Sequence, residues 1–118
     1  MGHLSTHVLD LMHGCPAAGM RVSLQALDGA GARTIKSFTL NADGRTDGGP
    51  LLTADTMAVG RYRLVFSVAQ YFRDRGVTLP EPAFIDEVPI EFGIADAGGH
   101  YHVPLLASPW AYSTYRGS

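Results

Sequence analysis

The sequence predicts a single all-β domain, residues 1–118, built as a sandwich of about eight short strands with one short helix. Two observations support this fold class. Several short segments alternate apolar and polar residues strictly, which is typical of strands with one buried face. Clusters rich in glycine, proline, asparagine and aspartate separate these segments and are typical of turns. The length of 118 residues suits one domain with a single core.

In the first half of the chain we expect four strands. Residues 4–10 and 33–40 alternate only weakly, whereas residues 20–27 place Met20, Val22, Leu24 and Ala26 at every second position. Residues 49–53 are short and follow glycines, so we expect a short edge strand there.

The second half contains the clearest strand patterns and the helix. Alternation is strict in residues 61–68, 87–94 and 100–106 and continues in 110–115. Residues 69–76 favour a helix, because Tyr71 and Phe72 can face inward and Gly76 can end it.

Composition excludes several classes of function. The net charge is −2 and 17% of residues are charged, which gives no electrostatic reason to expect nucleic acid or an anionic membrane as partner. No apolar run approaches a membrane span, and the start of the chain lacks the pattern of a signal peptide. We therefore expect a cytoplasmic protein, or a periplasmic one if a leader has been removed. The single cysteine, Cys15, is expected to be a small packed thiol, with a Cys15–His13 catalytic pair as the weaker alternative.

Alternation also predicts which polar residues share a face. If Val8 points into the core, His7 points outward, and by the same rule His100 and His102 point away from the core. Tyr115 is expected on that outer side as well. Arg45 lies in the glycine-rich segment NADGRTDGG, which can bring a guanidinium close to a ligand.

Each of these residues also has an ordinary interpretation. Outward histidines and loop arginines are commonly just solvated. A metal site formed by His100 and His102 with His7 lacks a complete ligand set, and DGRTDGG lacks the ligand pattern of a calcium loop. We therefore expect no metal site among these residues.

Taken together, however, four separated motifs resemble the transthyretin-related family over essentially the whole chain. They are LSTHVLDLMHGCPAAG, NADGRTDGG, EVPIEF with HYHVPLL, and the final YSTYRGS. The family contains vertebrate transthyretin, a thyroid-hormone carrier, and the 5-hydroxyisourate hydrolases of urate breakdown. The final YRGS, and His7 where the carrier has lysine, are similar to the hydrolase class.

The resemblance implies a transthyretin (prealbumin)-like sandwich of two four-stranded sheets, assembled as a homotetramer with its site in a channel between subunits. By matching motifs it implies catalytic roles for His7, Arg45, His102 and Ser118. His100 has no certain match.

The implied reaction is hydrolysis of 5-hydroxyisourate to 2-oxo-4-hydroxy-4-carboxy-5-ureidoimidazoline by attack of water on a cyclic amide, without a cofactor. Tyr115, Arg116 and Gly117 are implied to bind substrate, with the Ser118 hydroxyl or carboxylate completing the pocket. A small-molecule carrier that uses the same channel, such as a thyroid-hormone carrier, and a purely structural sandwich are the alternatives.

Overall fold

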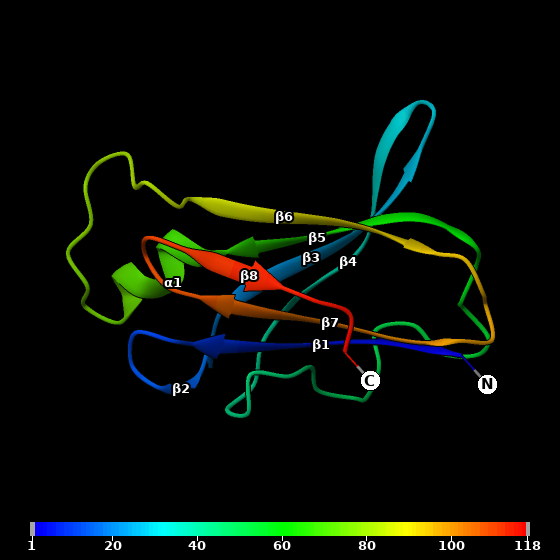
Figure 1. Ribbon diagram of the computed structural model, residues 1–118, viewed down its shortest axis with the longest axis horizontal. Helices are drawn as coiled ribbons and strands as arrows, with labels where there is room; N and C mark the ends of the chain where they lie inside the picture. Colours follow the sequence, from blue (N-terminus) through cyan, green and yellow to red (C-terminus); the bar gives the residue numbers. More distant parts are fainter. Residues whose placement is uncertain (1, 118) are drawn as a thin grey trace.

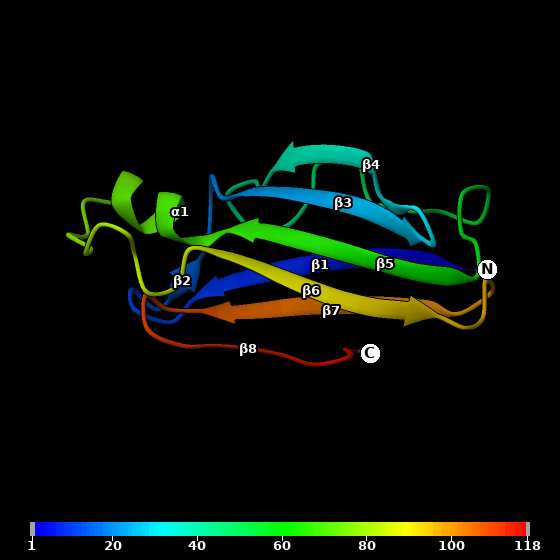
Figure 2. The same cartoon turned by 90° about the horizontal axis from the view of Figure 1, so that it is seen from above.

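Residues 2–117, which a computed structural model describes, form two four-stranded sheets packed face to face (Figures 1 and 2). One sheet has the order β2-β1-β7-β8 and the other β4-β3-β5-β6. The strands are β1 (His3–Asp10), β2 (Cys15–Pro16), β3 (Arg21–Asp28), β4 (Gly31–Thr39), β5 (Gly60–Ser67), β6 (Glu87–Ile94), β7 (His100–Ala107) and β8 (Tyr112–Thr114). The predicted all-β sandwich is therefore confirmed.

The two sheets differ in the relative directions of their neighbouring strands. In the second sheet every neighbouring pair of strands is antiparallel. In the first sheet the central pair is parallel, since β1 runs beside β7 with His3 opposite His100 and Asp10 opposite Ala107. This pairing brings the two ends of the sequence together in the middle of one sheet.

The core lies between the sheets and follows the alternation of the strands. On β1 the inward residues Leu4, Thr6, Val8 and Asp10 are buried, and the residues between them are only partly covered. The largest fully buried apolar side chains come from both sheets and from the helix: Leu4, Val8, Met20, Leu24, Leu64, Phe66, Val68, Phe72, Val88, Ile94 and Leu105.

The predicted helix is present as α1 (Val68–Asp74), directly after β5. Tyr71 and Phe72 are buried as expected, and Gly76 follows with a φ of 85°, a conformation that favours glycine and ends the helix. The helix lies at the end of the sandwich where the β1–β2 and β7–β8 turns also lie (Figure 1). Within the described residues, no helix is long and apolar enough to cross a membrane.

Three boundaries differ from the predictions. The strand predicted over residues 49–53 is wrong: only an isolated bridge between Leu4 and Leu52 forms there, because Gly48, Gly49 and Pro50 precede it. Cys15–Pro16, for which no strand was predicted, forms the short strand β2. The last strand covers only Tyr112–Thr114 of residues 110–115.

Candidate active site

His7 and His102 lie on the outer face of the sheet that contains β1 and β7. They belong to the central parallel pair, in which Ser5 is opposite His102 and His7 is opposite Pro104. Their sequence neighbours Val8 and Val103 are buried in the core, so both histidines face outward, as alternation predicts. The pairing of the first strand with the seventh therefore brings together two residues far apart in sequence.

The His102 ring is held by Ser5. The Ser5 Oγ and His102 Nδ1 atoms share a hydrogen bond of 2.8 Å between neighbouring strands. When Nδ1–H donates to Ser5, Nε2 carries the lone pair and can accept a proton from water. Sequence reasoning missed Ser5, although its position two residues before His7 on a strand gives it the same outward parity.

Arg45 lies in a loop that is held against β1 by backbone contacts. Val8 N–H donates to the Gly44 carbonyl at 3.0 Å. Gly44 has a φ of 71°, and a Cβ built on it would lie 2.5 Å from the Val8 carbonyl oxygen, so only glycine fits this approach. The Asn41 side-chain oxygen accepts from the backbone N–H groups of Asp43 and Arg45 at 2.9 and 3.1 Å, which fixes the shape of the loop.

The electrostatics show that these groups share one environment. Burial, followed by the positive charge of Arg45, lowers the pKa of His7 below its ordinary value, although a backbone hydrogen bond with Asp43 opposes the shift. Burial and Arg45 also lower the pKa of His102, with smaller contributions from His7 and His3. Both imidazoles are therefore held in the neutral form that can act as a base near neutral pH.

The segment after β8 also contacts His102, from the edge of β7 opposite to β1. Gly117 N–H donates to the His102 carbonyl at 2.8 Å. A Cβ on Gly117 would lie 2.5 Å from His102 Cδ2, so the glycine backbone lies directly against the imidazole. Ser118, the remaining predicted catalytic residue, lies outside the described residues.

Arg116 does not join the two histidines. Arg116 extends over the ring of Tyr101, which belongs to the buried face of β7. Tyr115 contributes to a groove of about 350 Å³ that Tyr101 and Val103 also line. The bridge between His102 and Gly117 continues the register of β7 and β8, so Tyr115 falls opposite Pro104, and its place on the outer side with His102 stays a prediction.

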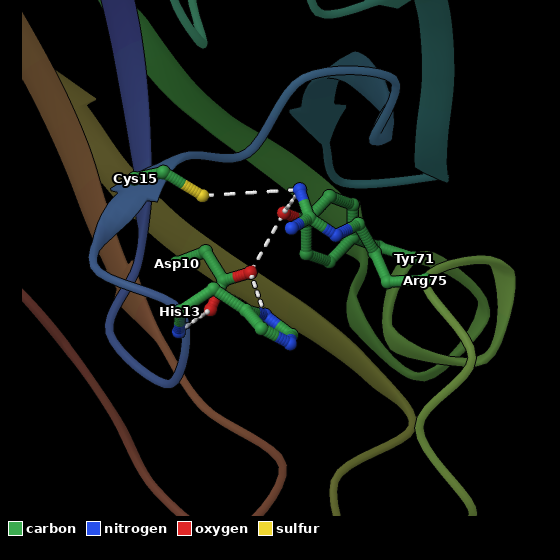
Figure 3. Close-up of polar contacts among 5 residues, drawn as sticks. All are labelled: Asp10, His13, Cys15, Tyr71 and Arg75. Carbon is green, nitrogen blue, oxygen red and sulfur yellow. Dashed lines mark hydrogen bonds and ion pairs between the residues drawn. The ribbon is translucent and has the colours of Figure 1, made fainter.

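A second polar cluster lies at the α1 end of the molecule (Figure 3). The buried Asp10 carboxylate accepts hydrogen bonds from the Tyr71 hydroxyl at 2.8 Å and from the backbone N–H of His13 at 2.9 Å, and it pairs with His13 Nδ1 at 2.6 Å. Cys15 instead points toward Arg75, with Sγ 3.8 Å from Nη1. His13 and Cys15 are thus engaged by different partners, which does not support a Cys15–His13 catalytic pair.

The outer face also carries His3 and His100. Their rings lie opposite each other on β1 and β7, with centroids 4.2 Å apart. Across residues 2–117, no group of three or more histidine, cysteine or acidic side chains is arranged to hold a metal ion.

Comparison with known proteins identifies relatives over nearly the whole chain. The family model described as the HIUase/Transthyretin family matches residues 4–117. The 5-hydroxyisourate hydrolase 2 of Rhizobium meliloti (strain 1021) is 54% identical, covering 99% of this chain and 97% of that protein. The solved structure of Klebsiella pneumoniae 5-hydroxyisourate hydrolase matches with a TM-score of 0.79 and 35% identity, over 98% of this chain and 99% of that one. Transthyretin from Sparus aurata matches with a TM-score of 0.84 and 26% identity, over 97% and 95%.

Proposed function

Because this chain belongs to the HIUase/Transthyretin family, we propose that it is a hydrolase that opens the ring of 5-hydroxyisourate in urate breakdown. The observation that supports this most strongly is the shared environment of His7, His102 and Arg45. Two neutral imidazoles beside a permanent positive charge suit acid–base chemistry on a polar, planar substrate. The curated hydrolase relatives, similar over the full length of the chain, support the same reaction.

The proposed reaction needs three functions from the site. A histidine removes a proton from water as the water oxygen bonds to the amide carbonyl carbon. The guanidinium of Arg45 stabilises the negative charge that develops on the carbonyl oxygen. When the tetrahedral intermediate collapses, the ring C–N bond breaks and a protonated histidine returns the proton to the leaving nitrogen. His7 and His102 share these proton transfers, and each is regenerated at the end of the cycle.

Residues 115–118 also have roles in the proposed site. The backbone of Gly117 lies against His102 and so borders the proposed site. Ser118 follows it in the sequence and is proposed, by resemblance alone, as the fourth catalytic residue. Tyr115 belongs to the same motif and is proposed, by resemblance, to bind substrate, whereas the contact of Arg116 with the Tyr101 ring favours an indirect role for Arg116.

We also propose that copies of the chain assemble into a homotetramer. Four large apolar side chains near the ends of β1 and β7 are exposed: Leu11, Met12, Trp110 and Tyr112. Leu11 N–H donates to the Ala107 carbonyl at 2.8 Å, so the β1–β2 turn lies beside the turn that carries Trp110. An apolar surface of this kind is typical of a contact between subunits. Sedimentation at micromolar concentration tests it, and a fully active monomer would contradict it.

The decisive experiment is turnover of freshly generated 5-hydroxyisourate, followed by loss of its ultraviolet absorbance against the spontaneous background. Binding of thyroxine is measured in parallel. We expect catalysis above background and weak thyroxine binding, because a carrier channel is predominantly apolar whereas this face carries two histidines and an arginine. Tight thyroxine binding without turnover would overturn the proposal in favour of a carrier.

A further inference from the structure

We propose that Arg116 is a positioning residue, which anchors the final segment on one face of β7 so that Gly117 remains against the His102 imidazole on the other. The inference rests on the proposed hydrolase function for its kinetic part. It gives Arg116 a role other than direct contact with substrate.

The anchor is formed by one aromatic ring and one backbone carbonyl. The guanidinium carbon of Arg116 lies 4.2 Å from the centroid of the Tyr101 ring, within the range of a cation–π contact. Its Nη2 donates a hydrogen bond to the His100 carbonyl at 3.0 Å. A planar guanidinium can make both contacts at once, whereas the ammonium of lysine is a compact charge that stacks less well.

Tyr101 is itself a rigid platform. Its side chain is only 7% exposed, and its hydroxyl accepts hydrogen bonds from the backbone N–H groups of Ala95 and Asp96, each at 3.0 Å. The ring is therefore fixed by the core on one side and by the β6–β7 connection at its tip. An arginine stacked on such a ring fixes the backbone of its own segment.

The two neighbouring residues of the segment contact opposite faces of β7. Arg116 stacks on the inward Tyr101, and Gly117 lies against the outward His102. Gly117 approaches the Cδ2 edge of the imidazole, whereas Ser5 holds the ring at Nδ1. The imidazole is thus confined from two sides, and one of these depends on the position of the terminal backbone.

The position of the Arg116 side chain distinguishes this role from substrate binding. Its polar atoms are directed to β7, on the side of the strand away from His7 and His102. Releasing it should therefore free Gly117 without removing a group that faces the substrate. We expect the loss to appear mainly in kcat, because the geometry of the base is disturbed while the charge of Arg45 still attracts substrate.

The test compares Arg116→Ala with Arg116→Lys, and uses Arg33→Ala, a change at an exposed arginine on β4, as the matched control. Turnover of 5-hydroxyisourate should fall about 10- to 100-fold in Arg116→Ala with little change in KM. The lysine variant should recover part of it, and the control should equal wild type. Gly117→Ala, which forces a Cβ against His102, should reproduce the loss with Arg116 intact.

Two measurements by nuclear magnetic resonance test the anchor without relying on catalysis. In Arg116→Ala the Gly117 amide should lose its protection from hydrogen exchange. The pKa of His102 should rise toward its ordinary value as the ring becomes better solvated. If both remain as in wild type, the anchor is wrong. If both change but kcat does not, the positioning role is wrong. If the wild-type protein does not hydrolyse 5-hydroxyisourate, the proposed function fails while the two resonance measurements still judge the anchor.

Discussion

Replacing Gly44 with alanine should separate the loop that carries Arg45 from the strand that carries His7. A new Cβ at this position would lie 2.5 Å from the Val8 carbonyl oxygen, 3.1 Å from Pro16 Cβ and 3.3 Å from Ala17 N. Two of these three atoms belong to backbone, so they cannot turn away as a flexible side chain could. Gly48→Ala is a close control, because Gly48 has a similar φ of 79° but has open space where its Cβ would be.

The two variants differ in one cost. Both place alanine at positive φ, which costs about 1–2 kcal/mol of unfolding free energy. Gly44→Ala adds the cost of overpacking, about 1–3 kcal/mol, unless the loop moves away and gives up the Val8–Gly44 hydrogen bond, worth about 0.5–1.5 kcal/mol. Either response shifts Arg45 relative to the two histidines, and a displacement of about 1 Å can reduce turnover about 100-fold.

Urea denaturation and turnover of 5-hydroxyisourate, measured on both variants, test this reasoning. We expect Gly44→Ala to be less stable than Gly48→Ala and to lose most of its activity, while Gly48→Ala keeps nearly all of it. Equal stability and equal turnover in the two variants would show that the close approach to Val8 does not position Arg45.

Further predictions concern the histidines, the buried cluster and metals. His7→Asn and His102→Asn should each reduce turnover about 10²- to 10⁴-fold with little change in melting temperature, and near-wild-type turnover would remove that residue from the mechanism. Since the pKa values of both histidines are lowered from 6.5, kcat/KM should fall only when pH drops below 6.5, and a decline beginning above it would contradict the neutral-base assignment. Asp10→Ala should cost about 1–3 kcal/mol because the buried Tyr71 hydroxyl loses its acceptor, whereas His13→Ala, at a side chain 29% exposed, should cost less than about 1 kcal/mol; equal losses in denaturation would refute this. Although burial raises the pKa of Asp10, the hydrogen bonds from His13 and Tyr71 outweigh it and lower this pKa from 3.8, so the stabilising effect of Asp10 should be present above that pH and disappear as acid titrates the carboxylate; an Asp10→Ala destabilisation as large in acid as at neutral pH would contradict it. Activity should survive exhaustive chelation with EDTA, and its loss with recovery on adding zinc would revive a metal site at His100 and His102.

The sequence was most informative where local geometry is regular. Alternation along β1 and β7 correctly predicted that His7 and His102 face outward, because strand parity depends only on the backbone. It could not predict that Ser5 would be opposite His102, since that pairing joins residues 97 positions apart and depends on register. Parity also holds beyond Thr114, because Gly117 pairs with His102 in the register of β7 and β8, which leaves Arg116 on the side of Tyr101 and Gly117 on the side of His102.

Turn chemistry and close approaches were harder to predict. The glycine-rich loop around Arg45 was recognisable, but the contact that makes Gly44 necessary lies with Val8 on a strand far away in the sequence. Residues 49–53 have suitable apolar residues for a strand, yet their backbone pairs only once. The short strand at Cys15–Pro16 has no sequence pattern of its own and exists because Asp10 and Leu9 lie beside it.

The parallel pairing of β1 with β7 also bears on how the molecule is made. Residues 21–94 contain all four strands of the antiparallel sheet, so a growing chain can complete that sheet from near neighbours. β1 precedes the other described strands in the sequence but has no partner for its parallel edge until residues 100–107 have been synthesised. Because distant pairings form slowly, we expect β1 to remain the most exposed and aggregation-prone strand of the nascent chain. We therefore expect His7 and His102 to come together only after residues 100–107 have been synthesised.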